Sequence, residues 1–265
     1  MLIAGEASGD LLAAELVREL RAQSLAREPG IAPRFFGAGG PKMAEAGVEL
    51  AFDMTAHSVI GLVEVLKNYG KFKKLFDQLL ELAFARQPDV IVCVDFSGFN
   101  RRFAHAVRAR LATQRGAFAN WRPRIVQYVS PQVWASRADR AASMARDFDL
   151  LLCIFPFERD WYAARVPDFP VEFVGHPIVD RYANLGAELK LGLGATPAIV
   201  LLPGSRVGEL RRHLPPMFDA ARRIAERERA AFTMILPNES LAALARPVAQ
   251  KIPDLRVHVG GLARA

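Results

Sequence analysis

The chain has 265 residues, enough for one large domain or for two domains of ordinary size. Apolar residues make up 51% of it and charged residues 24%, a balance typical of globular proteins, and no apolar run approaches the roughly 18–20 residues of a membrane-spanning helix. Lys and Arg outnumber Asp and Glu by 35 to 28. The net charge of +7 favours anionic partners such as phosphorylated ligands, anionic lipid or nucleic acid.

The N-terminus shows no basic region followed by an apolar core, so we expect no secretory signal. A short apolar strand opens the chain, and the loop Gly5–Asp10 leads into a helix that runs to about Arg21. Glu6 and Asp10 would repel a pyrophosphate, which favours a hydroxyl-bearing ligand over a dinucleotide at this loop. The alternative is a plain turn in which Ser8 or Asp10 caps the helix.

A second strand is expected at residues 34–36, followed by a glycine-rich bend and a short helix near 42–46. The stretch 57–80 then combines a crowded apolar segment with lysines, a pattern that suits the surface of an anionic membrane. The same pattern fits two ordinary helices whose lysines face solvent. The candidates for membrane or acyl-chain contact are Val59, Ile60, Leu62, Val63, Leu66, Lys73 and Lys74.

Residues 88–94 predict the strongest strand, which is fully apolar after Asp89 and is followed directly by Asp95. In an open parallel sheet, ligands gather at the carboxyl ends of the strands. Asp95 is therefore a candidate catalytic base, with a helix cap as the alternative. The helix expected at 101–114 is rich in arginine but has an apolar face, which favours a solvated basic helix over a nucleic-acid surface.

Further elements are expected at 124–129, 138–145, 150–154 and 171–174. Cys93 and Cys153 lie inside apolar, strand-like runs, which favours buried thiols in a reducing cytosol over a disulfide or a metal site. His176 follows the last of these elements, and no second histidine stands at metal-ligand spacing, so we expect no metal.

We place a linker at residues 183–197, a glycine-rich and aperiodic stretch, between a domain at 1–182 and a second domain at 198–265. We expect the second domain to be incomplete, because a nucleotide-binding domain normally runs to about 150 residues.

The apolar run 199–202 predicts a strand that is covered on both faces. Gly204 and Ser205 interrupt the run, and a helix begins near Val207. A helix that starts after a glycine turn presents unpaired backbone N–H groups and a positive dipole end. The turn therefore predicts a phosphate site, to which Arg206 could add a bidentate contact. The alternative is a tight turn with a solvated arginine.

Several short motifs follow one another in a fixed order: GEASGD, GAGGPKM, VIGLVEVL, VDFSGFN, YVSPQVWA, FPFE, FVGHP and LLPGSR-x-x-E. Each motif is weak alone, but the ordered set resembles the lipid-A-disaccharide synthase family along nearly the whole chain. The resemblance implies an α/β fold of the glycosyltransferase B type, in which two Rossmann-like domains with parallel sheets face each other across a cleft. The second of these domains would be incomplete in this chain.

The resemblance also implies a reaction. The family transfers 2,3-diacylglucosamine from its UDP derivative to 2,3-diacylglucosamine 1-phosphate with inversion, and releases UDP and lipid A disaccharide 1-phosphate. No metal or other cofactor is implied. The implied partners are the two acylated substrates and the membrane surface, not nucleic acid, with a possible homodimer through a missing C-terminal region. The implied location is the cytoplasm, peripheral on the inner face of the cytoplasmic membrane.

The family's site residues transfer to this chain by motif. Asp95 matches the catalytic aspartate, whose role would be to take the proton of the attacking hydroxyl. The segment that would meet the UDP diphosphate consists of Gly204, Ser205, Arg206 and Glu209. The acceptor-side positions are Ser8, Gly9, Asp10 and Asn100. Both substrates are acylated, which gives the apolar and lysine-rich stretch 59–76 a use.

The chain departs from the family pattern at three places. Ser136 replaces a tryptophan, Gly98 stands where many members carry an acid, and the C-terminal motifs for the uridine and ribose are absent after Ala265. Two other functions stay open. One is another nucleotide-sugar enzyme of the same fold, such as a UDP-sugar epimerase, which would not need the apolar and lysine-rich stretch. The other is a truncated, inactive fragment that binds lipid or UDP.

Overall fold

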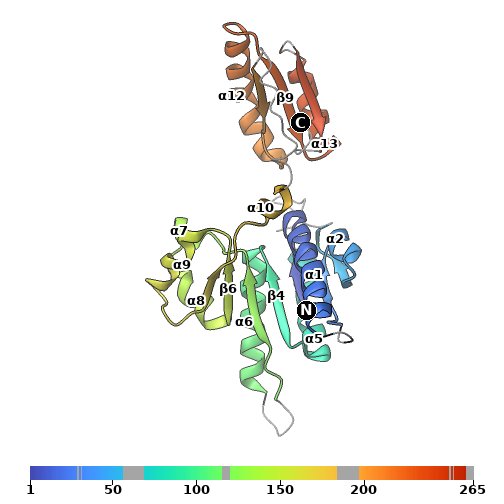
Figure 1. Ribbon diagram of the computed structural model, residues 1–265, viewed down its shortest axis with the longest axis vertical. Coiled ribbons are helices and arrows are strands. Elements are labelled where there is room, and N and C mark those ends of the chain that lie inside the picture. Colours follow the sequence, from blue (N-terminus) through green and yellow to red (C-terminus); the bar gives the residue numbers. More distant parts are fainter. Residues whose placement is uncertain are drawn as a thin grey trace. The chain divides into compact units, whose positions relative to one another are not determined.

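The computed structural model describes residues 1–28, 30, 32–55, 69–114, 120–183, 197–250, 252 and 254–260, without the side chains of residues 69, 71 and 72. The chain divides into two compact units, Met1–Asn184 and Leu185–Ala265. Figure 1 shows strands with helices packed against them in each unit. The five apolar candidates for membrane contact, and residues 184–196 of the expected linker, lie outside the described residues.

The first unit alternates strands and helices, as its apolar runs and amphipathic segments predict. Its strands are β1 (Leu2–Ala4), β2 (Phe36–Gly39), β3 (Glu49–Asp53), β4 (Val90–Val94), β5 (Arg124–Tyr128), β6 (Leu150–Cys153) and β7 (Val171–Phe173). Its helices are α1 (Ala7–Arg27), α2 (Pro41–Glu45), α5 (Tyr69–Arg86), α6 (Ser97–Thr113), α7 (Val133–Ser136), α8 (Arg140–Asp147), α9 (Pro156–Ala163) and α10 (Pro177–Tyr182).

The seven strands form one parallel sheet in the order β3-β2-β1-β4-β5-β6-β7. The chain builds outward from β1 to β3 and then returns to the other side of β1 with β4. The direction of winding therefore reverses between β1 and β4, which makes this pair the topological switch point of a doubly wound sheet. Ala4 pairs with Val94, so the loops that follow the two strands begin at the same level.

Helices cover both faces of this sheet (Figure 1). On one face, α1 and α2 bury Ala13, Val17 and Met43 completely. On the other face, α5, α6 and α8 pack over the sheet around Phe103 and Ile125. Burial on both faces explains why continuous apolar runs, rather than alternating ones, mark β4 to β6 in the sequence.

The start of α1 differs from the expectation. Glu6 occupies the N-cap position, and neither of the two residues expected to cap the helix does so. Asp10 lies inside α1 and is buried, and its carboxylate accepts hydrogen bonds from the backbone N–H groups of Gly40, Lys42 and Met43 at 2.8, 2.9 and 3.0 Å. Asp10 therefore caps α2, which begins some thirty residues further along the chain.

The second strand also differs from the expectation. It spans Phe36–Gly39 and is fully buried, so most of the segment expected to bend is strand. A glycine is necessary at position 37 of this strand, because a Cβ at Gly37 would collide with the backbone carbonyl of Leu2 on β1. The edge strand β3 was not predicted, because its side chains alternate between half-buried and exposed and give no long apolar run.

The second unit contains a three-stranded parallel sheet in the order β10-β9-β8. Its elements are β8 (Ala198–Leu201), α12 (Val207–Ala225), β9 (Ala231–Leu236), α13 (Glu239–Ala249) and β10 (Leu255–Val259). Leu210 and Phe218 of α12 pack with Phe232 and Met234 of β9 in the core of this unit.

The expectation that β8 is covered on both faces is wrong for the described residues. Leu201 is buried, whereas Val200 is 47% exposed and the following Leu202 is 52% exposed. The core of this unit takes only one side of the strand, since α12 and α13 contribute to a single cluster. Among the helices that the structure describes, none is long and apolar enough to cross a membrane.

The cap that Asp10 forms predicts a stability effect. Asp10→Ala leaves three backbone N–H groups at the start of α2 without their acceptor, two of them in buried hydrogen bonds. The free energy of unfolding should fall by about 1–3 kcal/mol. Asp10→Asn, which keeps one acceptor oxygen, should lose less. Urea unfolding followed by circular dichroism measures both, and equal stability of the alanine variant and the parent would contradict the assignment.

Candidate active site

The candidate active site of the first unit lies at the carboxyl ends of β1 and β4. Gly5 follows β1 and Asp95 follows β4, so both loops stand at the switch point, where open parallel sheets bind ligands. Gly5 allows the close approach of the two loops, because a Cβ at this position would collide with the Phe96 ring. A Cβ at Gly9 would lie in ordinary contact with the Cβ of Asp95, at 3.6 Å.

The loop after β4 has an unusual backbone. Asp95 and Phe96 have φ angles of 50° and 40°, and Val129, at the end of the neighbouring β5, has a φ of 70°. L-residues rarely adopt this left-handed region, and a β-branched valine does so least readily. Such residues cost about 1–3 kcal/mol each and persist only where their surroundings hold them. The ends of two adjacent strands are therefore held in a strained conformation.

Two buried amides hold this conformation. The side-chain amide of Asn100 donates to the carbonyl oxygens of Asp95 at 2.8 Å and Val94 at 3.3 Å. The side-chain amide of Gln127 donates to the carbonyl oxygens of Asp95 at 3.1 Å and Val129 at 3.1 Å. Because both amides reach the same oxygen of Asp95, that carbonyl is the centre of the bonded network.

The carboxylate of Asp95 is available for chemistry. The side chain is partly exposed, and within the described part of the chain no hydrogen bond or ion pair engages its oxygens. Asp95 is not the N-cap of α6, a position that Phe96 occupies in the left-handed conformation. The alternative of a helix cap is therefore wrong, and the free carboxylate suits a general base.

The four acceptor-side positions divide into one exposed residue and three internal ones. Ser8 is exposed in the first turn of α1, whereas Gly9 is buried beside Asp95. Asp10 is engaged by α2, and Asn100 is fully buried and bonded to the loop. Of the four, Ser8 alone lies where a ligand could touch its side chain.

The sequence motifs did not predict a role for Gln127. It is the fourth of the five residues of β5, follows the apolar Ile125 and Val126, and is completely buried. A single amide inside an otherwise apolar strand is the signal that could have identified it, because a buried amide requires hydrogen-bond partners.

The second candidate site is the turn between β8 and α12. Gly204 has a φ of 120°, and the carboxylate of Glu209 folds back over the turn. It accepts hydrogen bonds from the backbone N–H groups of Ser205 at 2.9 Å and Arg206 at 3.2 Å. The bond from Ser205 is the main reason that the pKa of Glu209 lies below its usual value.

The expectation of unpaired N–H groups at this turn is therefore wrong for two of them. Glu209 itself supplies the anion at the helix N-terminus, the position in which a phosphate was expected. The guanidinium of Arg206 lies 3.7 Å from the same carboxylate and remains largely exposed. The turn thus binds a carboxylate of its own chain, and a diphosphate would have to replace it.

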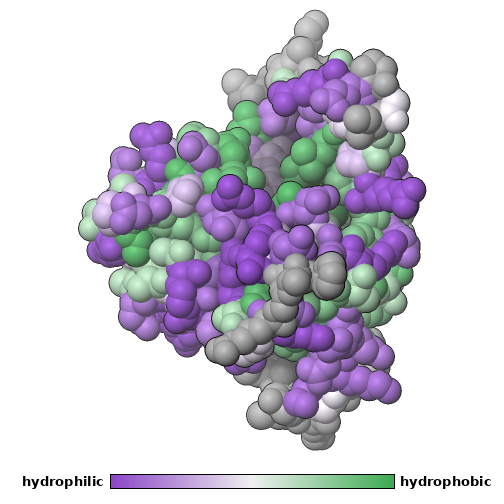
Figure 2. Space-filling model, turned by 90° about the horizontal axis from the view of Figure 1, so that it is seen from below, coloured by the Kyte–Doolittle hydropathy of each residue, from purple (hydrophilic) through white to green (hydrophobic). Residues whose placement is uncertain are grey.

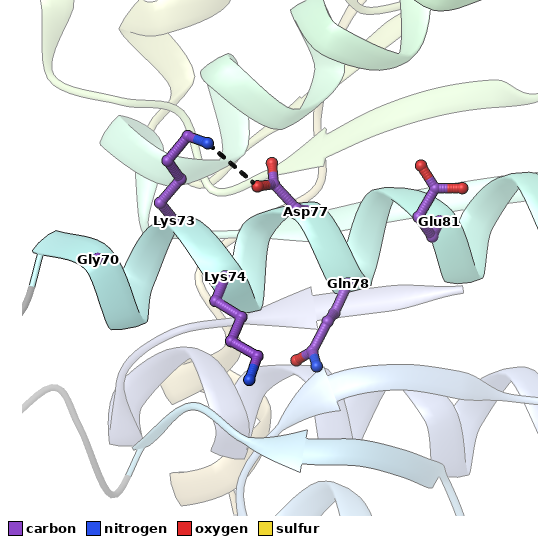
Figure 3. Close-up of a pocket in the computed structure, with 6 residues that line it drawn as sticks. All are labelled: Gly70, Lys73, Lys74, Asp77, Gln78 and Glu81. Atoms are coloured by element: carbon purple, nitrogen blue, oxygen red, sulfur yellow. Dashed lines mark hydrogen bonds and ion pairs between the residues drawn. The ribbon is translucent and has the colours of Figure 1, made fainter.

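The lysines of the proposed membrane segment lie on α5. A hollow runs along this helix, and Figure 3 shows Lys73 and Asp77 on one side of α5 and Lys74 and Gln78 on the other. Lys73 approaches Asp77 at 3.5 Å in an exposed ion pair. The described residues that line the hollow all come from α5, so within the described part of the chain no groups from different elements converge there.

Two arginines of α6 form ion pairs within the first unit. Arg108 contacts Asp149 at 2.6 Å, and Arg110 contacts Glu81 at 2.5 Å. The hydrogen bond from Arg110 lowers the pKa of Glu81. On the face seen in Figure 2, hydrophilic and hydrophobic residues are interspersed. Arg108 and Arg110 are thus engaged by acidic side chains of other elements.

The two cysteines are free and buried, as expected. Burial raises the pKa of the Cys93 thiol to about 12 and that of Cys153 to about 11, so neither is a reactive thiolate at neutral pH. Among the described residues, no group of three or more His, Cys, Asp or Glu side chains could hold a metal ion.

Comparisons with known proteins agree with the motif order. A model of the lipid-A-disaccharide synthetase family matches residues 1–260. A lipid-A-disaccharide synthase of Myxococcus xanthus is 39% identical over 242 residues, which cover 89% of this chain and 58% of that protein. The corresponding protein of Geobacter sulfurreducens is 38% identical over 232 residues, which cover 86% of this chain and 56% of that protein.

Solved structures show the fold alone. The apo structure of OtsA has a TM-score of 0.52 at 15% identity and covers 99% of this chain and 73% of its own. A structure titled as a UDP-N-acetylglucosamine 2-epimerase from Listeria monocytogenes has a TM-score of 0.58 at 11% identity and covers 98% and 68%. Together with the two parallel sheets, these likenesses confirm the glycosyltransferase B-like α/β fold.

The chain spans a little over half the length of the curated relatives it matches. The family match nevertheless extends over nearly all of this chain, and the identity to relatives is close to 40%. The chain therefore belongs to the lipid-A-disaccharide synthase family of glycosyltransferases.

Proposed function

We propose that the full-length protein transfers 2,3-diacylglucosamine from its UDP derivative to 2,3-diacylglucosamine 1-phosphate, with inversion. The observation that carries this proposal is the unengaged carboxylate of Asp95 at the switch point of the first sheet. Membership of the family supports the choice of substrates.

In this mechanism Asp95 accepts the proton of the acceptor hydroxyl as its oxygen attacks the anomeric carbon. The bond from that carbon to the UDP oxygen breaks on the opposite face, so a single displacement inverts the centre. One positioned base suffices for such a step. Exposed Ser8 would contact the acceptor, while Gly9, Asp10 and Asn100 would shape the site from inside.

The departing UDP carries the negative charge that develops during the displacement. We assign its diphosphate to the turn formed by Gly204, Ser205 and Arg206, where backbone N–H groups and a guanidinium are close together. For the diphosphate to bind there, Glu209 must release these amides and act from the rim of the site.

The proposal also covers the acyl chains of the two substrates and the membrane surface at which the protein acts. Lys73 and Lys74 on α5 would attract anionic lipid headgroups, and the apolar residues between 59 and 66 would enter the membrane or contact the acyl chains. The protein would then act at the cytoplasmic face of the inner membrane. A homodimer through a C-terminal region stays part of the proposal.

Replacement of the base tests the mechanism. Asp95→Asn keeps the size of the side chain but cannot accept the proton, so kcat should fall by about 10²–10⁴-fold. UDP affinity should stay unchanged. Steady-state transfer assays and calorimetry on the full-length protein measure the two quantities. Near-normal turnover would remove Asp95 from the mechanism, and accumulation of an epimerised UDP-sugar would favour the epimerase alternative.

Replacement of the arginine tests the nucleotide site. Arg206→Lys keeps the charge but loses the planar fork, so UDP binding should weaken by up to roughly 1.5–3 kcal/mol, the range for a hydrogen bond to a charged group. Arg212→Lys, an exposed arginine further along α12, is the matched control. Isothermal calorimetry that gives both variants the parent's affinity would rule out Arg206 as a phosphate ligand.

Substitutions in and beside the apolar segment test membrane contact. The pair Val63→Ser and Leu66→Ser, and the pair Lys73→Glu and Lys74→Glu, should each reduce co-sedimentation with anionic liposomes. High salt should weaken only the contribution of the lysines. Lys42→Glu, on a helix that covers the opposite face of the sheet, is the control. If folded variants sediment with the liposomes as the parent does, the segment does not contact the membrane and belongs to the hydrophobic core.

A further inference from the structure

Gln127 is a polar residue in a row of register neighbours across the sheet that is otherwise apolar. The strand register puts it beside Cys93 of β4 and Leu151 of β6, both completely buried. The row continues with Ile3 on β1 and Val171 on β7, so every neighbour in it is apolar. An amide buried among such side chains costs free energy unless it is hydrogen-bonded.

The bonds of Gln127 are directed to the ends of two strands. Its Nε2 donates to the carbonyl oxygens of Asp95 at 3.1 Å, Tyr128 at 3.3 Å and Val129 at 3.1 Å. Asp95 and Val129 are two of the residues with positive φ at this edge. The amide therefore reaches both strained residues at once, one at the end of β4 and one at the end of β5.

We propose that Gln127 is a positioning residue for Asp95, a role that rests on the function proposed above. Its amide links the end of β4 to the end of β5 and holds the Asp95 backbone in the left-handed conformation from which the carboxylate leaves the loop. Gln127 touches no substrate in this proposal and acts only through Asp95.

Asn100 cannot replace this link. It donates to Asp95 and Val94 from α6, and all three residues belong to the same β4–loop–α6 segment. Among the described side chains, Gln127 alone joins the Asp95 carbonyl to the end of β5. The backbone bond from Asp95 N to Tyr128 O at 2.9 Å runs in parallel with it.

The side-chain oxygen of Gln127, Oε1, is buried without a hydrogen-bond partner in the described structure. Gln127→Met removes this orphaned oxygen together with the donor and keeps the length of the side chain, so the variant should fold. Leu151→Met, the register neighbour on the same face, is the matched control, because it changes the core without touching the loop. Gln127→Asn, which keeps an amide on a shorter stem, is a second test.

The first measurement needs no activity. Native-state hydrogen exchange in the full-length protein should accelerate by about an order of magnitude at the amides of Asp95 and Val129 in Gln127→Met, and stay at the parent's rate in Leu151→Met. Both amides are hydrogen-bonded at the strand ends, to the carbonyls of Tyr128 and Leu152. Unchanged exchange in both Gln127 variants would overturn the link.

The second measurement is a double-mutant cycle on kcat. Gln127→Met alone should lower kcat about 10–100-fold, the loss expected from a misplaced group, with UDP affinity unchanged. In the Asp95→Asn background it should lower kcat no further, because the base is already absent. A full additional loss in that background would overturn the proposal and assign Gln127 a purely structural role.

The two measurements separate this inference from the proposed function. If Asp95→Asn retains near-normal turnover, the base assignment fails and the positioning role fails with it, whatever the exchange rates are. If Asp95→Asn is inactive and exchange at Asp95 does not respond to Gln127, the base assignment survives and the positioning role alone is wrong.

Discussion

The hydrogen bonds between the ends of β4 and β5 are the constraint on which the candidate site depends. Asp95 and Val129 both take backbone conformations that L-residues avoid, and the amides of Gln127 and Asn100 hold the first of them from two sides. A loop that relaxed to ordinary angles would carry the Asp95 carboxylate elsewhere. The amides of Asn100 and Gln127 are buried where the sheet would otherwise be apolar, and within the described part of the chain their side-chain oxygens have no hydrogen-bond partner.

The turn between β8 and α12 shows the opposite arrangement. Glu209, from the first turn of α12, already accepts hydrogen bonds from the backbone N–H groups of Ser205 and Arg206. In the proposed function a diphosphate would have to displace this carboxylate, because the two anions cannot share the same N–H groups. That displacement would lower the affinity for UDP and so favour release of the product.

Sequence reasoning identified the parts of the fold that are local and missed those that are not. The apolar runs predicted β4, β5 and β6, and the position after the strongest strand made Asp95 the candidate base. Asp10 was assigned to its own helix because capping rules consider only neighbouring residues, whereas its partners begin at Gly40. The role of Gln127 depends on which strands pair. Strand order alone brings β5 beside β4, and no spacing along the chain encodes it.

Most of the buried residues in the two motifs at the switch point, GEASGD and VDFSGFN, have structural roles. In GEASGD, Gly5 leaves room for the Phe96 ring and Asp10 bonds α1 to the start of α2, while Ser8 is exposed. In VDFSGFN, Asn100 bonds the loop and Asp95 remains free. In both motifs the buried residues shape the switch point, and the accessible side chains include Ser8 and Asp95. In the proposed function the acceptor binds at this edge of the sheet, where α1 with Ser8 follows β1 and Asp95 follows the adjacent strand β4.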